Sequence, residues 1–272
     1  MLHKCDVRLG YHFAGNKVCY YGLDQSGEKV YRFNSLGFRG DEFNPKAVKN
    51  IFIAGCSYTL GVGLNFEETW GYQFKQKVAK EAGLGLKEIG LMNFSVGGAS
   101  NDYITRILLT QMSLYKPDLV IAYFTHSSRI EYIDESSINM LGPWCVNSDI
   151  TNDFYKQQHL DDVEEAAFSF FSYTTQELEF INMLKNMLLL QEYCKSHNIK
   201  LMFGSVYSKD LLNKCKEMNS VCSQFLDLLD TERYFKFNLD KIDAASDNSH
   251  PGVRSNKKFA EKLFETYQKS MI

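Results

Sequence analysis

Apolar and polar positions along the chain follow two alternating patterns. Short apolar runs, typical of buried strands, are separated by longer stretches in which apolar residues recur every three or four positions. The short runs predict strands at 50–54, 90–94, 119–124, 200–206 and, more weakly, 234–237. The longer stretches predict helices at 67–82, 101–115, 174–197, 209–230 and 254–270. Strands that alternate with amphipathic helices pair in parallel, so the pattern predicts an α/β fold, a three-layer sandwich.

Two segments depart from this alternation. Residues 1–48 contain short aromatic-rich runs such as KVCYYGLD and EKVYRFN, which predict a small N-terminal β appendage. Residues 134–172 show no clear period, and long irregular segments in compact domains are typically lids or loops. We interpret 134–172 as an insertion or lid over the substrate site, within one domain that spans 49–272.

Composition limits the classes of function. The chain has 272 residues, of which 44% are apolar and 23% charged, as in ordinary globular proteins. The formal charge of −3 and the lack of a basic cluster argue against a nucleic-acid partner. The apolar runs are far shorter than the roughly 18 to 20 residues of a membrane span, and the N-terminus does not resemble a secretory signal, so we expect a cytoplasmic protein. Seven cysteines without a CxxC pair indicate reduced thiols rather than disulfides or a zinc site.

The stretch GCSYTLGVG, at 55–63, directly follows the first strand of the alternation. Ligands bind at the carboxyl ends of strands in parallel sheets, and Ser57 lies just beyond such an end. Gly55 allows a tight exit from the strand, while Gly61 and Gly63 permit positive φ angles. The stretch can therefore present a nucleophilic serine, or it can be an ordinary turn, because glycine and serine are common in turns.

A serine nucleophile needs a base that accepts its proton and an acid that orients the base. DNSHPG, near the C-terminus, supplies both, with Asp247 three residues before His250. At this spacing the carboxylate can fix the imidazole tautomer and leave the second ring nitrogen for the serine. The alternative is a surface loop in which Asp247 begins a turn and Pro251 starts the last helix.

The residues and their order resemble the sequence blocks of the SGNH, or GDSL, hydrolases. GCSYTLGVG is similar to the family's GDSxTxGxG pattern, with Cys56 in place of the usual aspartate, and DNSHPG matches the last block. NFSVGGASND, at 93–102, resembles the second block and aligns Gly98 with the family's oxyanion glycine. Upstream, NSLGFRGDEF resembles a lead-in found in many bacterial and phage members.

The resemblance implies a parallel, flavodoxin-like sheet and a serine-dependent active site. Ser57 would be the nucleophile, and Asp247 and His250 would complete the triad. The backbone amides of Ser57 and Gly98 would form the oxyanion hole.

The third block departs from the family pattern, which commonly contains Gly-x-Asn-Asp with the asparagine as a third oxyanion donor. This chain has YFTHSSR at 123–129, where His126 or Ser127 lies nearest that position. Removing one oxyanion donor can cost about 2.7–4 kcal/mol of transition-state stabilisation. Asn101 is a further candidate for the third oxyanion donor if its loop turns inward. Tyr123 and Trp144 are candidates for stacking on a substrate, and packing in the core is the alternative for both.

Ester hydrolysis or acyl transfer, without a metal or organic cofactor, is the activity that the resemblance implies. The expected substrate is a small-molecule or glycan ester, with an O-acetyl group on a carbohydrate favoured. Three alternatives remain open: an O-acyltransferase with the same triad, a non-catalytic glycan- or protein-binding module on this fold, and Cys56 as the nucleophile.

Overall fold

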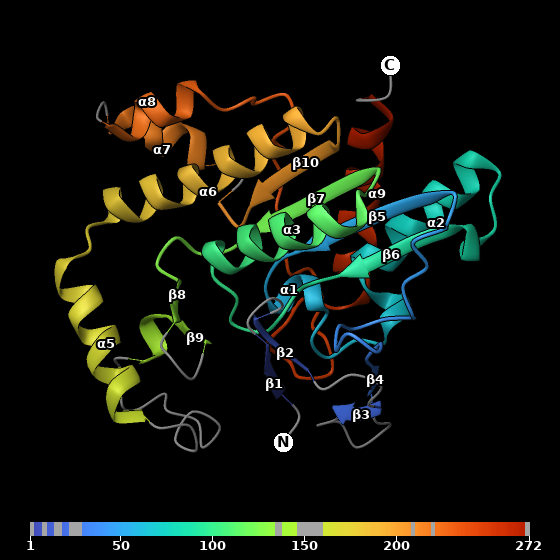
Figure 1. The fold of residues 1–272 in the computed structure, drawn as a ribbon, viewed down its shortest axis with the longest axis horizontal. Coiled ribbons are helices and arrows are strands. Elements are labelled where there is room, and N and C mark those ends of the chain that lie inside the picture. Colours follow the sequence, from blue (N-terminus) through green and yellow to red (C-terminus); the bar gives the residue numbers. More distant parts are fainter. Residues whose placement is uncertain are drawn as a thin grey trace.

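A sheet of four parallel strands forms the centre of the protein in the computed structural model, which describes residues 3–6, 10–13, 18–21, 29–133, 138–145, 160–207, 210–218 and 221–269. The spatial order is β10–β7–β5–β6 (Figure 1), and the strands are β5 (Lys49–Ala54), β6 (Ile89–Asn93), β7 (Leu119–Phe124) and β10 (Lys200–Ser205). These strands match four of the predicted ones to within one residue. Their residues are almost all buried, as expected for a parallel sheet that is covered on both faces.

Helices cover both faces of the sheet, which confirms the predicted three-layer α/β sandwich (Figure 1). One face carries α2 (Trp70–Ala82) and α9 (Val253–Lys269), which pack against each other. The other carries α3 (Asn101–Tyr115) and α6 (Gln176–Ser196), which also pack together. Among the helices that the structure describes, none is long and apolar enough to cross a membrane.

Alternation of side chains along the strands divides the apolar residues between two clusters. Ile51 and Ile53 of β5 belong to the cluster that includes α2 and α9, whereas Phe52 belongs to the cluster that includes α3 and α6. All three side chains are fully buried. The strands are therefore apolar on both faces, which explains their continuous apolar runs in the sequence.

The fifth predicted strand, at 234–237, is limited to one β-bridge. Tyr234 pairs in parallel with Phe203 of β10, and Phe235 N donates a hydrogen bond to Phe203 O at 2.8 Å. No further bridge between this segment and β10 is found among the described residues, and farther along the amide of Leu239 donates to the hydroxyl of Tyr123 at 3.1 Å. In chain order the four strands occupy the places 2-1-3-4 of a flavodoxin-like sheet, and the bridge lies where the fifth would be.

Helices α3, α6 and α9 match their predicted ranges to within two residues. The predicted helix 67–82 is divided: a 3-10 turn, η1 (Phe66–Glu68), precedes α2, and Thr69 between them is extended and caps α2 through its side chain. The predicted helix 209–230 is also two helices, α7 (Leu211–Glu217) and α8 (Val221–Asp227).

Regular elements occupy the described parts of 134–172, so the expectation of an irregular segment is wrong for residues 138–145 and 160–172. They are α5 (Leu160–Tyr173), the 3-10 turn η3 (Pro143–Cys145) and strand β9 (Ile138–Leu141), which pairs with β8 (Ile130–Ile133). A helical spacing was present in the sequence, at Val163, Ala166, Ala167, Phe170 and Phe171. Figure 1 shows these elements on the side of the sheet toward which the strand arrows point.

The N-terminal region contains two antiparallel strand pairs, as predicted for a β appendage. They are β1 (His3–Asp6) with β2 (Gly10–Phe13), and β3 (Val18–Tyr21) with β4 (Lys29–Arg32). The chain that follows β4 enters the core: Phe38 is 1% exposed, and Arg39 forms an antiparallel bridge with Asn93 of β6. This segment therefore borders the edge of the central sheet.

Candidate active site

The chain leaves β5 through a single helical turn, α1 (Ser57–Leu60), which has Ser57 at its first position. Gly55 makes this exit possible, because a Cβ there would meet Thr59 Oγ1 at 2.2 Å and the backbone oxygen of Tyr123 at 3.1 Å. Gly61 ends the turn in the left-handed conformation at φ 79°, and Gly63 follows at φ 75°. Both positive φ angles were predicted from the glycine spacing.

A hollow of about 300 Å³ opens beside α1. It is lined by Cys56, Ser57, Tyr58, Tyr123, His126, Arg129, Val206, Asn238, Leu239 and Asp240. The lining residues come from the carboxyl ends of β5, β7 and β10 and from the segment that follows the bridge at Tyr234. None of them belongs to the described part of 134–172, so its action as a lid stays a prediction.

Asp247 and His250 form a hydrogen-bonded pair within one closed loop. Asp247 Oδ2 bonds to His250 Nδ1, and Asp247 Oδ1 accepts the backbone amides of Ser249 at 3.1 Å and His250 at 3.0 Å. Ala244 and Pro251 close the loop through an antiparallel bridge. The pair is therefore built by local contacts.

Electrostatics favour the ionised form of Asp247. Burial by itself would raise the pKa of this carboxyl group, but the hydrogen bonds from the amide and imidazole of His250 outweigh it and lower the pKa. A carboxylate that accepts Nδ1–H fixes the imidazole with Nε2 available to a further partner.

Contacts between two loops bring the serine helix and the histidine loop together. Gly63 O accepts hydrogen bonds from Ser246 N at 3.2 Å and Ser246 Oγ at 2.9 Å. The rings of Tyr58 and His250 meet edge to face with centroids 5.6 Å apart. His250 thus lies against the residue next to Ser57, although the Ser57 hydroxyl and the imidazole are not hydrogen-bonded to each other in this structure.

The second block lies beside α1, because β6 is the parallel neighbour of β5. Asn93, at the end of β6, donates through Nδ2 to Thr59 O of α1 at 3.1 Å and accepts Ser95 N through Oδ1 at 3.1 Å. Gly98 has a φ of 75°, which suits glycine, in the turn before α3. Ser57 and Gly98 therefore follow adjacent strands at the same edge of the sheet.

Asn101 connects the second and third blocks. Its Oδ1 accepts Thr125 N at 2.8 Å, and its Nδ2 donates to His126 O at 3.4 Å. The side chain is 3% exposed and both ends of the carboxamide are bonded to backbone. It fixes the third block in place, and it does not line the hollow beside Ser57.

The two third-block candidates have different surroundings. Ser127 is buried, and its hydroxyl donates to Glu179 Oε2 at 3.0 Å. His126 lines the hollow, with Nδ1 3.2 Å from the hydroxyl of Tyr207. Burial, together with the charge of Arg129, lowers the pKa of His126 and favours a neutral imidazole at pH 7.

The aromatic candidates also differ. Tyr123 is 1% exposed, stacks on Phe235 and accepts Leu239 N through its hydroxyl, so it forms part of the buried wall of the hollow. Trp144 lies in η3, and its side chain is outside the described part of the structure. Cys56 is 3% exposed and belongs to the main apolar cluster, which favours a packing role over a nucleophilic one.

Sequence reasoning assigned no role to three polar residues of the hollow, Arg129, Asn238 and Asp240. Arg129 donates to Thr125 Oγ1 at 3.0 Å, and Asn238 Oδ1 is buried without a hydrogen-bond partner among the described residues. Arg129 is the last residue of the third block, YFTHSSR, whereas Asn238 and Asp240 lie outside the blocks identified in the sequence. Among the residues that the structure describes, no group of three His, Cys, Asp or Glu could hold a metal ion.

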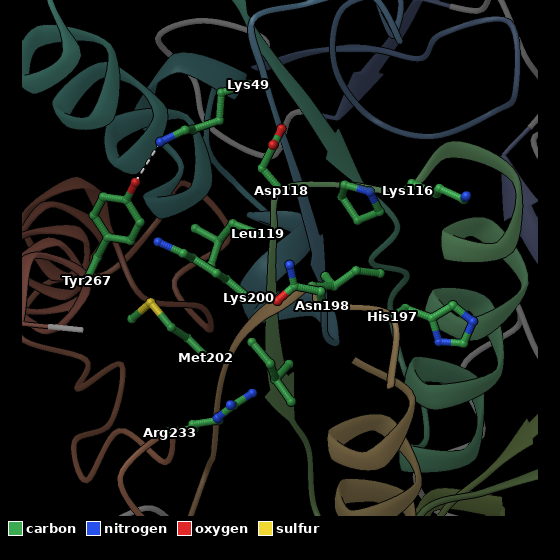
Figure 2. Close-up of a pocket in the computed structure, with 13 residues that line it drawn as sticks. Lys49, Lys116, Asp118, Leu119, His197, Asn198, Lys200, Met202, Arg233 and Tyr267 are labelled. Atoms are coloured by element: carbon green, nitrogen blue, oxygen red, sulfur yellow. Dashed lines mark hydrogen bonds between the residues drawn. The ribbon is translucent and has the colours of Figure 1, made fainter. Parts of the chain in front are cut away.

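A larger hollow, of about 680 Å³, lies at the opposite edge of the sheet (Figure 2). Its cationic residues include Lys49, Lys116, Lys200 and Arg233, and Lys49 Nζ donates to Tyr267 OH at 2.8 Å. Helices α3, α6 and α9 end around it, and cations commonly occur at helix C-termini, where the carbonyls carry partial negative charge. We therefore place the candidate active site in the smaller hollow, which contains Ser57.

Comparisons with known proteins find no matching family model and no matching curated protein. Among solved structures, the neighbours include an esterase, an acylhydrolase, a GDSL-like lipase and a lipolytic protein of the G-D-S-L family. A psychrotrophic esterase, EstA from Pseudoalteromonas sp., is 16% identical with a TM-score of 0.47, over 82% of this chain and 98% of that one. A carbohydrate esterase with divergent catalytic and non-catalytic binding functions is 11% identical with a TM-score of 0.46, over 95% and 89% of the two chains. A protein from Desulfitobacterium hafniense described as a lipolytic protein of the G-D-S-L family is 10% identical with a TM-score of 0.45. The match covers 80% of this chain and 99% of that one. Because all three TM-scores are below 0.5, the functional argument rests on this chain's own residues.

Gly63→Ala should destabilise the fold by about 1–3 kcal/mol, because it combines a positive φ with a steric clash. The added Cβ would meet Ala245 Cβ at 2.8 Å and Ser246 N at 3.1 Å. Urea unfolding would measure the loss, with Gly97→Ala as the control, because a Cβ at Gly97 meets no atom within 4 Å. Equal free energies of unfolding for the two variants would contradict the close approach of the loops.

Asp247→Asn should lower stability in a pH-dependent way. The pKa of Asp247 in the folded state is below its ordinary value of about 3.9, so ionised Asp247 stabilises the fold above that pH. This contribution disappears as the pH falls through the lowered pKa. The difference in unfolding free energy between wild type and Asp247→Asn should therefore be present at pH 6 and shrink below about pH 4. A difference that does not change with pH would contradict the assignment.

Proposed function

We propose that this chain is a serine hydrolase of the SGNH type that cleaves a carboxylic ester through Ser57, His250 and Asp247. The observation that carries the proposal is the junction at Gly63, where the loop that continues from Ser57 bonds to the loop that contains the Asp247–His250 pair. The order of the sequence blocks along the chain supports the same assignment. A nucleophile, a base and an orienting acid are the three groups that acyl transfer to serine requires.

In the proposed first half-reaction, the proton of Ser57 Oγ passes to His250 Nε2 while Oγ attacks the ester carbonyl carbon. The tetrahedral intermediate collapses when the C–O bond of the alcohol breaks, and His250 gives the proton to the leaving oxygen. Water then attacks the acyl-serine, with His250 again accepting a proton, and the acid leaves as Ser57 recovers its hydroxyl. Asp247 stays ionised and stabilises the imidazolium that forms in each half-reaction.

Backbone amides are the proposed stabilisers of the oxyanion. The amide of Ser57 is at the first position of α1, where helical amides have no carbonyl partner within the helix. The amide of Gly98 is the second donor, in the turn at the end of the adjacent strand. Backbone donors are already oriented before the reaction, which makes them effective at a developing negative charge.

For the third donor, we propose His126 ahead of Ser127. His126 lines the hollow with Ser57, whereas the hydroxyl of Ser127 donates to Glu179. The lowered pKa of His126 favours a neutral ring, and a neutral imidazole can donate one N–H to an oxyanion.

A short acyl group on a glycan or small molecule is the proposed substrate. The hollow of about 300 Å³ is small, and apolar side chains such as Tyr58, Val206 and Leu239 provide part of its lining. An O-acetyl ester matches this size, while the polar residues of the hollow suit a hydroxylated alcohol. Transfer of the acyl group to an acceptor hydroxyl is the second candidate, because it needs the same triad. A glycan- or protein-binding module is the third, favoured by Cys56 in place of the usual aspartate and by the altered third block.

Ser57→Ala and His250→Ala should each lower kcat for p-nitrophenyl acetate by at least about 1,000-fold, because triad members act as a unit. A fluorophosphonate should label Ser57 in the wild type and leave Ser57→Ala unmodified. Ser249→Ala is the matched control, since its exposed side chain lies in the same loop and only its backbone amide contacts Asp247. Equal slow rates in wild type and both triad variants, with a glycan still bound, would support the binding module. Product analysis with added sugar acceptors would distinguish transfer from hydrolysis.

His126→Ala should lower kcat by about 100-fold, the effect expected when one oxyanion donor is removed. Ser127→Ala should have a smaller effect, because its hydroxyl is bonded to Glu179. His197→Ala provides the control, since this exposed histidine lines the hollow at the opposite edge of the sheet. Steady-state kinetics at equal fold content would make the comparison, and an unchanged kcat in His126→Ala would exclude it as a donor.

A further inference from the structure

Arg39 is a buried arginine that bonds to the loop that follows the candidate nucleophile. Its side chain comes from the segment after β4 and donates through Nη1 to Leu60 O at 2.7 Å and to Gly61 O at 2.6 Å. Its Nη2 donates to Leu64 O. The residue is 1% exposed. Three backbone carbonyls of residues 60–64 are therefore fixed by one guanidinium group.

The guanidinium remains charged in this setting. Burial lowers the pKa of Arg39 to about 10, still well above neutral pH, and the nearby hydroxyl of Tyr31 and the carboxylates of Glu67 and Glu68 oppose the decrease. Its carbon Cζ lies 3.8 Å from the centroid of the Tyr31 ring, an arrangement typical of a cation–π contact. Burying a cation is unfavourable unless it is hydrogen-bonded, and here three backbone carbonyls accept hydrogen bonds from Nη1 and Nη2, while Nε has no hydrogen-bond partner among the described residues.

Tyr31 bonds to the same loop through its hydroxyl. Gly63 N donates to Tyr31 OH at 2.6 Å, and Tyr31 OH donates to Gly61 O at 3.4 Å. The loop has little room to move, because a Cβ at Gly61 would meet Thr69 Cγ2 at 2.4 Å and Arg39 Nη1 at 3.2 Å. Tyr31 thus bonds to the amide of residue 63 and the carbonyl of residue 61. Arg39 bonds to the carbonyls of residues 60, 61 and 64.

The loop continues this chain of contacts to the histidine loop. The amide of Gly63 donates to the hydroxyl of Tyr31, and the carbonyl of Gly63 accepts from Ser246, the residue before Asp247. A shift of Gly63 would therefore move the Asp247–His250 loop relative to α1. The Asp247–His250 pair itself would stay intact, because its hydrogen bonds lie within 247–250.

We propose that Arg39 and Tyr31 are positioning residues that set the alignment of His250 with Ser57, an inference that rests on the proposed hydrolase function. They act through the loop at 60–64 and do not contact the substrate. The N-terminal segment is thereby part of the catalytic unit. Its removal or loosening separates two correctly formed halves of the site.

Tyr31→Phe tests this directly, because it keeps the ring under Arg39 and removes only the hydroxyl. We expect kcat for p-nitrophenyl acetate and the rate of fluorophosphonate labelling to fall at least tenfold, with KM within about twofold of the wild type. Hydrogen exchange at the amides of Gly63 and Ser246 should become faster. The low-field NMR resonance of the His250 Nδ1 proton should persist, because the Asp247–His250 pair is local.

Arg39→Lys and Arg39→Met form the second arm. Lysine retains the charge but lacks the two-nitrogen fork, so it should recover only part of the labelling rate lost in the methionine variant. Ile107→Val, a fully buried change in α3, is the control for lost stability alone and should keep the wild-type kcat.

Unchanged kcat and labelling in Tyr31→Phe, in a wild type whose turnover depends on Ser57, would overturn the positioning role. Loss of the His250 resonance in Tyr31→Phe would also overturn it, because the damage would then lie in the pair. Equal turnover in wild type and Ser57→Ala would instead overturn the proposed function and the catalytic consequence inferred from it. Unchanged exchange at Gly63 and Ser246 would overturn the loop contact independently of activity.

Discussion

The close approach of Gly63 to residues 245–247 is the constraint on which the candidate site depends. The two segments are 183 residues apart in sequence, and Gly63 O accepts both the amide and the hydroxyl of Ser246. A Cβ at position 63 would lie 2.8 Å from Ala245 Cβ and 3.1 Å from Ser246 N, so the absence of Cβ is what permits the contact. Each half of the site is formed locally, and the parallel sheet brings the carboxyl ends of β5 and β6 to the same edge. The distance and orientation between the halves depend on this junction.

Buried asparagines organise the loops around this edge. Asn93 bonds to α1, Asn101 bonds to the third block, and Asn256 bonds to both Trp70 N and the carbonyls of Pro251 and Gly252. A carboxamide can donate and accept at once, so one buried side chain can satisfy two loops that have no regular hydrogen-bonding partner. Asn256 in particular connects Pro251 and Gly252, the two residues that follow His250, with Trp70 at the start of α2. The loops are therefore fixed by polar contacts, while the strands beneath them are fixed by apolar packing.

The sequence predicted the parts of the fold that have a strong period, and it predicted the contact between Asp247 and His250, which depends on a fixed spacing. Strands β5 and β7 were predicted well because their apolar runs are continuous. The contact between Asp247 and His250 was predicted because the two residues are only three positions apart. The break at Thr69 was missed because helical spacing continues across an N-cap whose backbone is extended. Helix α5 was missed although its alanines and phenylalanines have helical spacing. Arg39 could not be assigned from sequence, because its partners are backbone carbonyls, which leave no pattern in side chains.

Under the proposed function, the altered third block would affect the rate of the reaction more than its mechanism. Two of the proposed oxyanion donors are backbone amides, whose presence does not depend on side-chain identity. Their position depends instead on α1, on the turn at Gly98 and on the carboxamide of Asn93, which bonds to Thr59 O of α1 and to Ser95 N. Asn101 fixes the backbone of the third block from the outside, so this block keeps its place even though it lacks the family's asparagine. Under the proposed function, His126 would add a donor to a site whose geometry is already set, and a neutral histidine in place of an asparagine would change one donor among three.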